Sequence, residues 1–124
     1  METAELESKV YLALKTSAEI TGLLAEGENS IYHMLAPSGD GQQYPILVYS
    51  TISDVPSTYG DNEEKSHRIT IRIHIITEDG EYTEIYKEVN QIMIGLGFNR
   101  GQATPYFEQD KKMLVVDYRI VIEA

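Results

Sequence analysis

Few residues of the types that carry chemistry occur in this chain, and their spacing does not suit a site. Three histidines and no cysteine are present among 124 residues. His67 and His74 lie seven positions apart in one segment with strand periodicity, and an odd separation places two side chains on opposite faces of a strand. His33 lies in a different segment, without a carboxylate beside it in sequence. We therefore expect no metal centre, and the lack of cysteine excludes disulfides, thiolate ligands and cysteine nucleophiles.

The sequence also lacks the common motifs of catalysis and cofactor binding. Gly95, Gly97 and Gly101 have the spacing GxGxxxG, and they follow a predicted helix, whereas a phosphate-binding loop leads from a strand into a helix. Glu63 and Glu64 are adjacent carboxylates, but no apolar residues surround them to raise one pKa for acid catalysis. We therefore predict a protein that is not an enzyme and binds no cofactor.

The charge balance argues against nucleic acids and membranes as partners. Twenty acidic and ten basic residues give a net charge of −10, so the field of the whole molecule repels phosphate backbones and anionic lipid headgroups. Only Lys111 and Lys112 are adjacent bases, and no stretch approaches the roughly 18 apolar residues of a membrane span. Glutamates occupy the first residues, where a secretion signal needs positive charge. These features predict a soluble protein made in the cytoplasm, with no membrane association and no direct readout of nucleic acid sequence.

Helical periodicity marks three segments. From Ala4 to Lys15, apolar residues recur at steps of three and four, the spacing of one helix face. Ser17 is suited to cap a short second helix that Gly22 ends. A third helix is predicted from Gly80 to Leu96, with its apolar residues in one stripe.

Five segments have strand character. The clearest is His67 to Thr77, in which isoleucine occupies every second position and polar residues alternate with it. The other predicted strands are Ile31 to Met34, Pro45 to Asp54, Phe98 to Gln109 and Lys112 to Glu123. The order α, α, β, β, β, α, β, β predicts an α+β fold: a single layer of mainly antiparallel sheet, of four to five strands, with two to three helices packed on one face. Residues 1–124 are expected to form a single α+β domain.

One polar segment interrupts this pattern. Pro56 is expected to end the regular pairing of its strand. Ser57 to Ser66 contains Gly60, Asp61 and Asn62 and no periodic apolar residue, so it is predicted to be a ten-residue loop that is mobile in the monomer.

The second face of the predicted sheet carries polar side chains and faces either water or a partner. Its members are Arg68, Arg72, His74, Asp117, Arg119 and Glu123. Water is the commoner occupant of such a face in antiparallel sheets. The nine tyrosines exceed what a core needs and favour protein binding, because tyrosine combines an apolar body with a polar tip.

Several motifs together resemble the tail completion or tail terminator (head-to-tail joining) proteins of long-tailed phages and prophages. The similarity extends from Ile31 to Ala124. It rests on Ile31-Tyr32, Ala36-Pro37-Ser38-Gly39, Tyr44 to Tyr49, Ile52 to Pro56, the alternating strand His67 to Thr77, Gly97-Phe98, Tyr106 to Asp110, and Tyr118-Arg119-Ile120.

This resemblance implies a small subunit that assembles as a ring, usually of six, at the end of the tail tube. Such a ring stops elongation of the tube and provides the surface that joins the head. The implied partners are other copies of the chain, the tail tube protein and the head connector protein, first in the bacterial host cytoplasm and then in the virion tail. The candidate interface residues come from the polar segment and the polar face: Tyr59, Gly60, Asp61, Asn62, Glu63, Glu64, Lys65, Arg68, Arg72, His74 and Arg119.

Two other functions fit the same sequence. One is a small α+β ligand-binding regulatory domain, because fold alone does not determine function. The other is a neighbouring head–tail connector protein, which shares the logic of ring assembly. Native mass spectrometry separates the first from the ring, since a regulatory domain is a ligand-carrying monomer or dimer.

Overall fold

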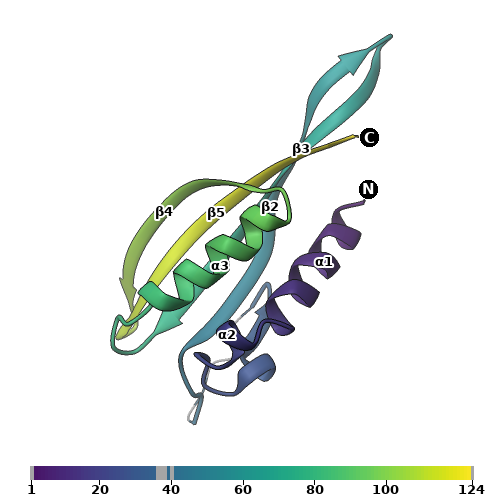
Figure 1. The fold of residues 1–124 in the computed structure, drawn as a ribbon. Helices are drawn as coiled ribbons and strands as arrows, with labels where there is room; N and C mark the ends of the chain where they lie inside the picture. Colours follow the sequence, from purple (N-terminus) through teal and green to yellow (C-terminus); the bar gives the residue numbers. More distant parts are fainter. Residues whose placement is uncertain (1, 36–38, 40, 124) are drawn as a thin grey trace.

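Five strands form one sheet in the order β1-β2-β3-β5-β4 (Figure 1). This computed structural model describes residues 2–35, 39 and 41–123, so that the motif at 36–39 lies, apart from Gly39, outside the described residues. The strands are β1 (Ile31–His33), β2 (Ile46–Gly60), β3 (Glu63–Thr77), β4 (Asn99–Glu108) and β5 (Lys111–Glu123). β1 runs parallel to β2, and the pairs β2–β3, β3–β5 and β4–β5 are antiparallel. The predicted, mainly antiparallel sheet is confirmed.

The helices pack on one face of this sheet (Figure 1). They are α1 (Thr3–Lys15), α2 (Ala18–Thr21) and α3 (Thr83–Gly95), and a 3₁₀ turn (Gly27–Ser30) leads into β1. α1 buries Leu6, Val10 and Leu14, the residues that recur at helical spacing in the sequence. Ser17 caps α2 as predicted, because its Oγ accepts a hydrogen bond from the Ile20 N–H at 3.2 Å. The predicted α+β class is therefore confirmed.

The core lies between the helices and the isoleucine face of β3. Its sheet side includes Ile69, Ile71, Ile73 and Ile75 of β3, Leu114, Val116 and Tyr118 of β5, and Ile31, Leu47 and Tyr49 of β1 and β2. Full burial of one isoleucine contributes about 1.5–3 kcal/mol. The Tyr118 hydroxyl donates to Asn90 Oδ1 of α3 at 3.2 Å, and burial raises the pKa of Tyr118 well above its usual range. The helices are thereby fixed to the two central strands.

The polar segment Ser57 to Ser66 is not a loop, which corrects the sequence prediction. β2 continues through Pro56 to Gly60 and pairs with β3, with register shifts on both sides of Thr58. Asp61 and Asn62 make a two-residue turn with φ of 52° and 65°, the left-handed pair that a type I′ hairpin requires. Pro56 is tolerated because β1 ends opposite Tyr49, which leaves this part of β2 as a sheet edge.

The open face of the sheet, which the helices leave uncovered, is less polar than the sequence predicted. At the end nearest β1 it carries an apolar cluster of Ile46, Val48 and Ile76, against which Tyr32, Tyr44 and Met113 pack. The polar residues lie further along β3 and β5, toward the β2–β3 hairpin. The break in alternation at Ile75-Ile76 is the sequence signal of this cluster.

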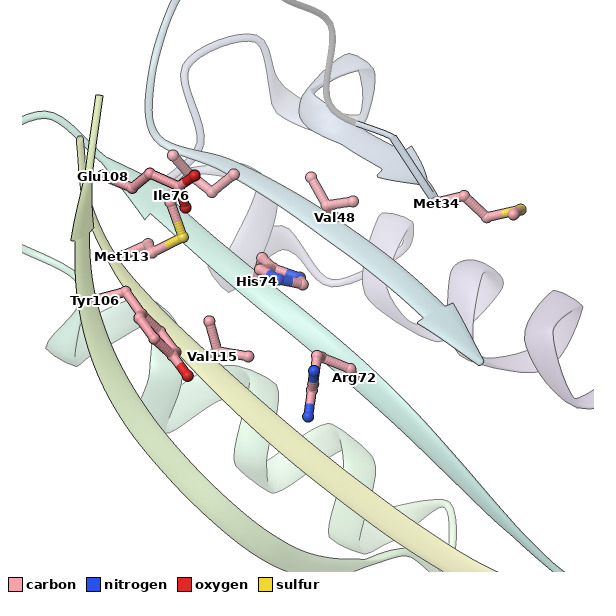
Figure 2. Close-up of a pocket in the computed structure, with 9 residues that line it drawn as sticks. All are labelled: Met34, Val48, Arg72, His74, Ile76, Tyr106, Glu108, Met113 and Val115. Atoms are coloured by element: carbon pink, nitrogen blue, oxygen red, sulfur yellow. The ribbon is translucent and has the colours of Figure 1, made fainter. Parts of the chain in front are cut away.

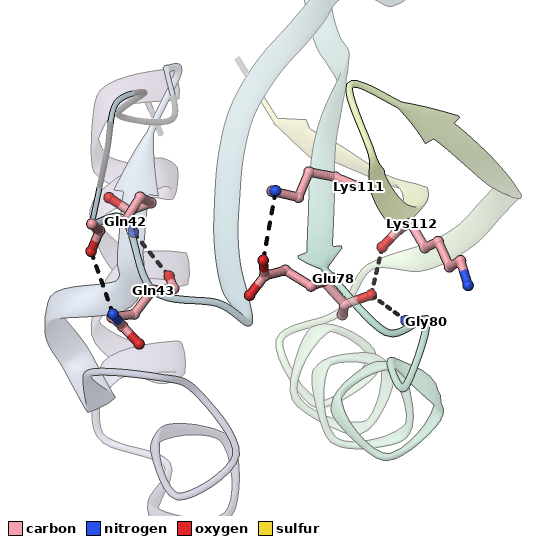
Figure 3. Close-up of polar contacts among 8 residues, drawn as sticks. Gln42, Gln43, Glu78, Gly80, Lys111 and Lys112 are labelled. Carbon is pink, nitrogen blue, oxygen red and sulfur yellow. Dashed lines mark hydrogen bonds and ion pairs between the residues drawn. The ribbon is translucent and has the colours of Figure 1, made fainter.

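The third helix begins later than its periodicity predicts, at Thr83 instead of Gly80. Gly80 has a φ of +82°, which a helix does not allow. Figure 3 shows the turn that holds it: the Gly80 N–H donates to Thr77 Oγ1 at 2.9 Å, and that hydroxyl donates to the Lys112 carbonyl. Beside it Lys111 Nζ lies 3.7 Å from Glu78 Oε2. This turn joins the ends of β3 and β5.

β4 forms one edge of the sheet, with β5 as its only neighbour. Its pairing shifts register between Arg100 and Ala103, and Pro105 lies in the middle of the strand. The pairing along this edge is therefore irregular, and Pro105 contributes no backbone N–H donor to it.

Candidate functional site

The β2–β3 hairpin extends beyond the rest of the sheet (Figure 1). The last pairing of β3 with β5 is Ser66 with Glu123, so residues 57–65, called the arm, consist of two strands only. At the root of the arm, the Thr58 and Ser66 hydroxyl oxygens lie 2.6 Å apart. A two-stranded hairpin is at best marginally stable alone in water. Within the described residues, the arm thus lacks the third strand and the helix packing that stabilise the rest of the sheet.

The arm combines one exposed aromatic ring with excess negative charge. The Tyr59 side chain is exposed, at 67%. Asp61, Glu63 and Glu64 carry three negative charges against the single positive charge of Lys65, which leaves −2 on the arm. Lys65 Nζ lies 3.5 Å from Glu63 Oε2, and both side chains are largely exposed, so this pair contributes at most ~1 kcal/mol.

A hydrogen-bonded network fixes the base of the arm to the first helix. His67 Nδ1 lies 2.7 Å from Asp54 Oδ1, and Asp54 Oδ2 accepts a hydrogen bond from Thr3 Oγ1 at 2.7 Å. The Thr3 hydrogen bond and then the His67 hydrogen bond lower the pKa of Asp54. The arm therefore projects from a base that α1, β2 and β3 hold together.

Two arginines lie in diagonal positions of neighbouring strands on the open face at the base of the arm. Arg68 of β3 pairs with Val121 of β5, and Thr70 pairs with Arg119, so Arg68, Arg119 and Val121 share this face and form what we call the cationic patch. Neither arginine forms an ion pair within the described residues. Val121 is 57% exposed. Within the described residues, the patch thus offers two guanidinium groups without an ion-pair partner beside an exposed apolar side chain, and Glu123, opposite Ser66, lies at its edge on the same face.

Gly101 supports one of these arginines. A Cβ atom at Gly101 would lie 3.0 Å from Arg119 Nη1 and 3.3 Å from its Cζ. The guanidinium group of Arg119 therefore lies against the backbone of β4, in space that a side chain at position 101 would occupy.

Arg72 differs from its neighbours because its acidic partner lies in the same chain. Its Nε donates to Asp117 Oδ1 at 2.8 Å and its Nη2 donates to Asp117 Oδ2 at 3.1 Å. The Asp117 hydrogen bonds raise the pKa of Arg72 further. Such a bidentate pair is the strongest common geometry between these groups. The charge of Arg72 is thus already neutralised within the chain.

A hollow of about 330 Å³ lies on the open face (Figure 2). It is lined by Met34, Val48, Arg72, His74, Ile76, Tyr106, Glu108, Met113 and Val115. Burial and then the charge of Arg72 lower the pKa of His74, against the smaller opposing effects of Asp117 and Glu108. The lowered pKa favours the neutral form of His74, and its buried Nδ1 has no hydrogen-bond partner among the described residues.

A second carboxylate–histidine contact, beside that of Asp54 with His67, was also not revealed by the sequence. Glu7 Oε2 of α1 lies 2.9 Å from His33 Nε2 and accepts a hydrogen bond from Thr51 Oγ1 at 2.9 Å. Burial acts to raise the pKa of Glu7, but these two hydrogen bonds outweigh it, so that the pKa is lowered. Since 26 and 44 positions separate the partners, no local motif signals this contact. It fixes α1 to β1 and β2.

The candidate residues thus fall into two groups. Tyr59, Gly60, Asp61, Asn62, Glu63, Glu64 and Lys65 lie in the arm, and Arg68, Arg72, His74 and Arg119 lie on the open face. Nowhere in the part of the chain that the structure describes do three His, Asp or Glu side chains converge as metal ligands would. In the same residues, no helix is long and apolar enough to cross a membrane.

Comparison with known families identifies the chain. The family described as Tail completion protein gp17 matches residues 8–123. The chain belongs to this tail completion family. The resemblance noted in the sequence is thereby confirmed, and members of the tail completion family are structural proteins of phage tails.

Solved structures support the fold of this tail completion family member. A chain described as "Virion of native gene transfer agent (GTA) particle" superposes with a TM-score of 0.62 at 13% identity, covering 93% of this chain and 92% of that one. A second solved structure superposes with a TM-score of 0.52 at 9% identity, covering 100% and 96%. At these identities the likeness concerns the fold alone. A search of curated proteins gave no match.

Proposed function

We propose that this protein assembles as a ring of six copies at the end of the finished tail tube, stops its elongation and presents the surface that joins the filled head. Membership of the tail completion family supports a role in the phage tail. The arm supports ring assembly, because an exposed two-stranded extension becomes stable when another molecule covers it. The partners in this proposal are other copies of the chain, the tail tube protein and the head connector protein, which meet in the host cytoplasm.

Termination of a tube requires shape and charge, and no bond is made or broken. One side of the ring matches the tube end, and the other side offers no equivalent site for a further tube subunit. Contacts around a ring are heterologous, so one surface of each copy fits a different surface of the next copy. The arm and the open face, on one compact unit, are two such surfaces. In this proposal the protein has no catalytic activity and acts as a single domain.

Polymerisation of the tail tube protein tests the proposal directly. Tube protein is polymerised with and without this protein, and tube lengths are measured by negative-stain electron microscopy. We expect shorter tubes that carry a density at one end and do not resume growth when more tube protein is added. Native mass spectrometry of the capped ends should release a six-membered species. Unchanged tube lengths would contradict the proposal, and binding to head connector rings without binding to tubes would favour the neighbouring connector.

The hollow on the open face supports a second candidate, a small ligand-binding regulatory domain. Its volume of about 330 Å³ lies at the lower end of the range for small-molecule sites. Native mass spectrometry of protein purified from its host separates the two candidates. A monomer or dimer of raised mass that carries a ligand would favour the regulatory domain over the ring.

A further inference from the structure

The chain carries two complementary surfaces that its own fold keeps apart. The arm has an exposed tyrosine and a net charge of −2, whereas the cationic patch has two free arginines around an exposed valine. Each surface therefore offers what the other lacks: an apolar centre bordered by charge of opposite sign. This match is notable in a chain of net charge −10, where cations are scarce.

The arm is unable to reach the cationic patch of its own molecule. Glu64 and Arg68 lie on the same strand four residues apart, which at about 3.4 Å per residue is roughly 14 Å. Arg119 pairs opposite Thr70, two residues further from the arm. Since the network of Asp54, His67 and Thr3 fixes the base of the arm, the strand does not fold back on itself. The two surfaces are satisfied only between molecules.

We propose that the arm of one copy lies on the cationic patch of a second copy of this chain. Glu64 pairs opposite Tyr59 and shares its face of the arm, whereas Glu63 points to the other face. In this contact Glu64 meets Arg68 and Arg119, and the Tyr59 ring packs on Val121. This contact rests on the proposed ring, for which it supplies the two unlike surfaces. Because every copy has one arm and one patch, the contact repeats from copy to copy until the rotation closes the ring.

The state of the arginines favours this occupant over solvent. Arg72 is neutralised by Asp117, so the free positive charge of this face is concentrated on Arg68 and Arg119. Arginine and tyrosine are also the residues that most often dominate the binding energy of interfaces.

Charge exchange between the two surfaces tests the contact. The arm variant carries Glu63→Lys and Glu64→Lys, and the patch variant carries Arg68→Glu and Arg119→Glu. All four side chains are exposed, so both variants should fold, which circular dichroism checks. Each variant alone places like charges in the contact, and we expect its ring assembly to weaken by at least about tenfold. An equimolar mixture restores attraction at every contact and should form a ring in which the two variants alternate.

Net charge is controlled within the same design. The two variants carry −6 and −14, so their mixture has the mean charge of −10 that the unchanged chain has. A matched control, Glu26→Lys with Glu28→Lys, makes the same charge change at exposed positions in and beside the 3₁₀ turn. This control should assemble as the unchanged protein does.

Cysteine cross-linking gives an independent measurement, because the chain has no cysteine of its own. A chain with Glu64→Cys and Arg119→Cys should form disulfides between copies, which appear as a ladder of multimers up to the closed ring on a non-reducing gel. The pair Glu26→Cys and Arg119→Cys should give no ladder. Native mass spectrometry then counts the copies in the unchanged protein, the variants and the mixture, each with tube ends present.

The outcomes distinguish the contact from the ring itself. Loss of the ring in both single variants, its return in the mixture and a ladder beyond the dimer would support the contact. Rings that persist in the variants, or no return in the mixture, would overturn the contact and leave the proposed function intact. A ladder that stops at two copies would overturn the head-to-tail arrangement. Failure of the unchanged protein to cap tubes as a ring would overturn the proposed function instead.

Discussion

Arg72 and Arg119 lie on the same face of the sheet, but their replacement should affect different properties. Replacement of Arg72 should affect the stability of the monomer, and replacement of Arg119 should affect assembly. Arg72→Met removes two hydrogen bonds to Asp117, at 2.8 and 3.1 Å, and leaves a carboxylate that is 11% exposed without its cation. Arg119→Met removes a side chain that has no ion pair within the described residues. We therefore expect Arg72→Met to destabilise the monomer and Arg119→Met to weaken the proposed ring.

The size of the first effect follows from the geometry of the pair. A hydrogen bond to a charged group contributes about 1.5–3 kcal/mol when it is shielded from water. The Arg72 side chain is 40% exposed, so water can replace part of the lost hydrogen bonding to Asp117. We therefore expect Arg72→Met to lower the free energy of unfolding by about 1–2 kcal/mol. In a chain of this length that corresponds to a fall in Tm of roughly 3–8 °C. Arg119→Met should change the free energy of unfolding by less than about 0.5 kcal/mol, as exposed substitutions usually do.

Urea unfolding followed by circular dichroism measures the first quantity, and native mass spectrometry of capped tube ends measures ring assembly. A double variant, Arg72→Met with Asp117→Leu, serves as the control, because replacing both partners removes the buried unpaired charge and should cost less than the sum of the single changes. The reasoning is refuted if Arg119→Met lowers stability as much as Arg72→Met. It is also refuted if Arg72→Met leaves stability unchanged.

Three further predictions concern the arm and the core. The pKa of Asp54 is lowered in the folded protein. Its contribution to stability is therefore present above the unfolded pKa of about 3.9 and is lost as the pH falls through the folded value. The variant Asp54→Asn should accordingly lose less stability below about pH 4 than the unchanged protein, as measured by urea unfolding at a series of pH values. Asn62→Val places a β-branched residue at a φ of 65° and should destabilise the hairpin by about 1–2 kcal/mol, whereas Asn62→Gly should not; amide exchange at Tyr59 measures this. Ile73→Ala empties a fully buried site and should cost about 2–5 kcal/mol in urea unfolding; a loss below 1 kcal/mol would contradict the described core.

The elements that bury a face were predictable from sequence, because burial imposes a period on the residues. The alternating isoleucines of β3 and the helical spacing in α1 are local signals, and the structure confirms both. The arm lacked such a signal, since a two-stranded extension buries no face and its residues are free to be polar. Its turn residues, Asp61 and Asn62, are nevertheless typical of a type I′ hairpin. That turn chemistry was the information available for recognising the strand.

The candidate site was only partly predictable, because its character depends on pairing between distant strands. Arg72 and Asp117 are 45 residues apart, and they meet because the register of β3 and β5 places them opposite each other. The same register leaves Arg119 opposite Thr70 and therefore free of an acid. Sequence alone named Arg72 and Arg119 as equivalent members of one polar face. Only the register separates the neutralised arginine from the available one.

The irregular outer strand β4 has a consequence for the life of the free subunit. An edge strand presents unpaired backbone groups that recruit the edges of other molecules, and such recruitment produces fibres and aggregates. The register shift between Arg100 and Ala103 and the proline at position 105 interrupt the row of donors and acceptors along this edge. Copies that accumulate in solution thus have no regular strand along β4 on which to stack. The free subunit is in this way hindered from starting a polymer of its own.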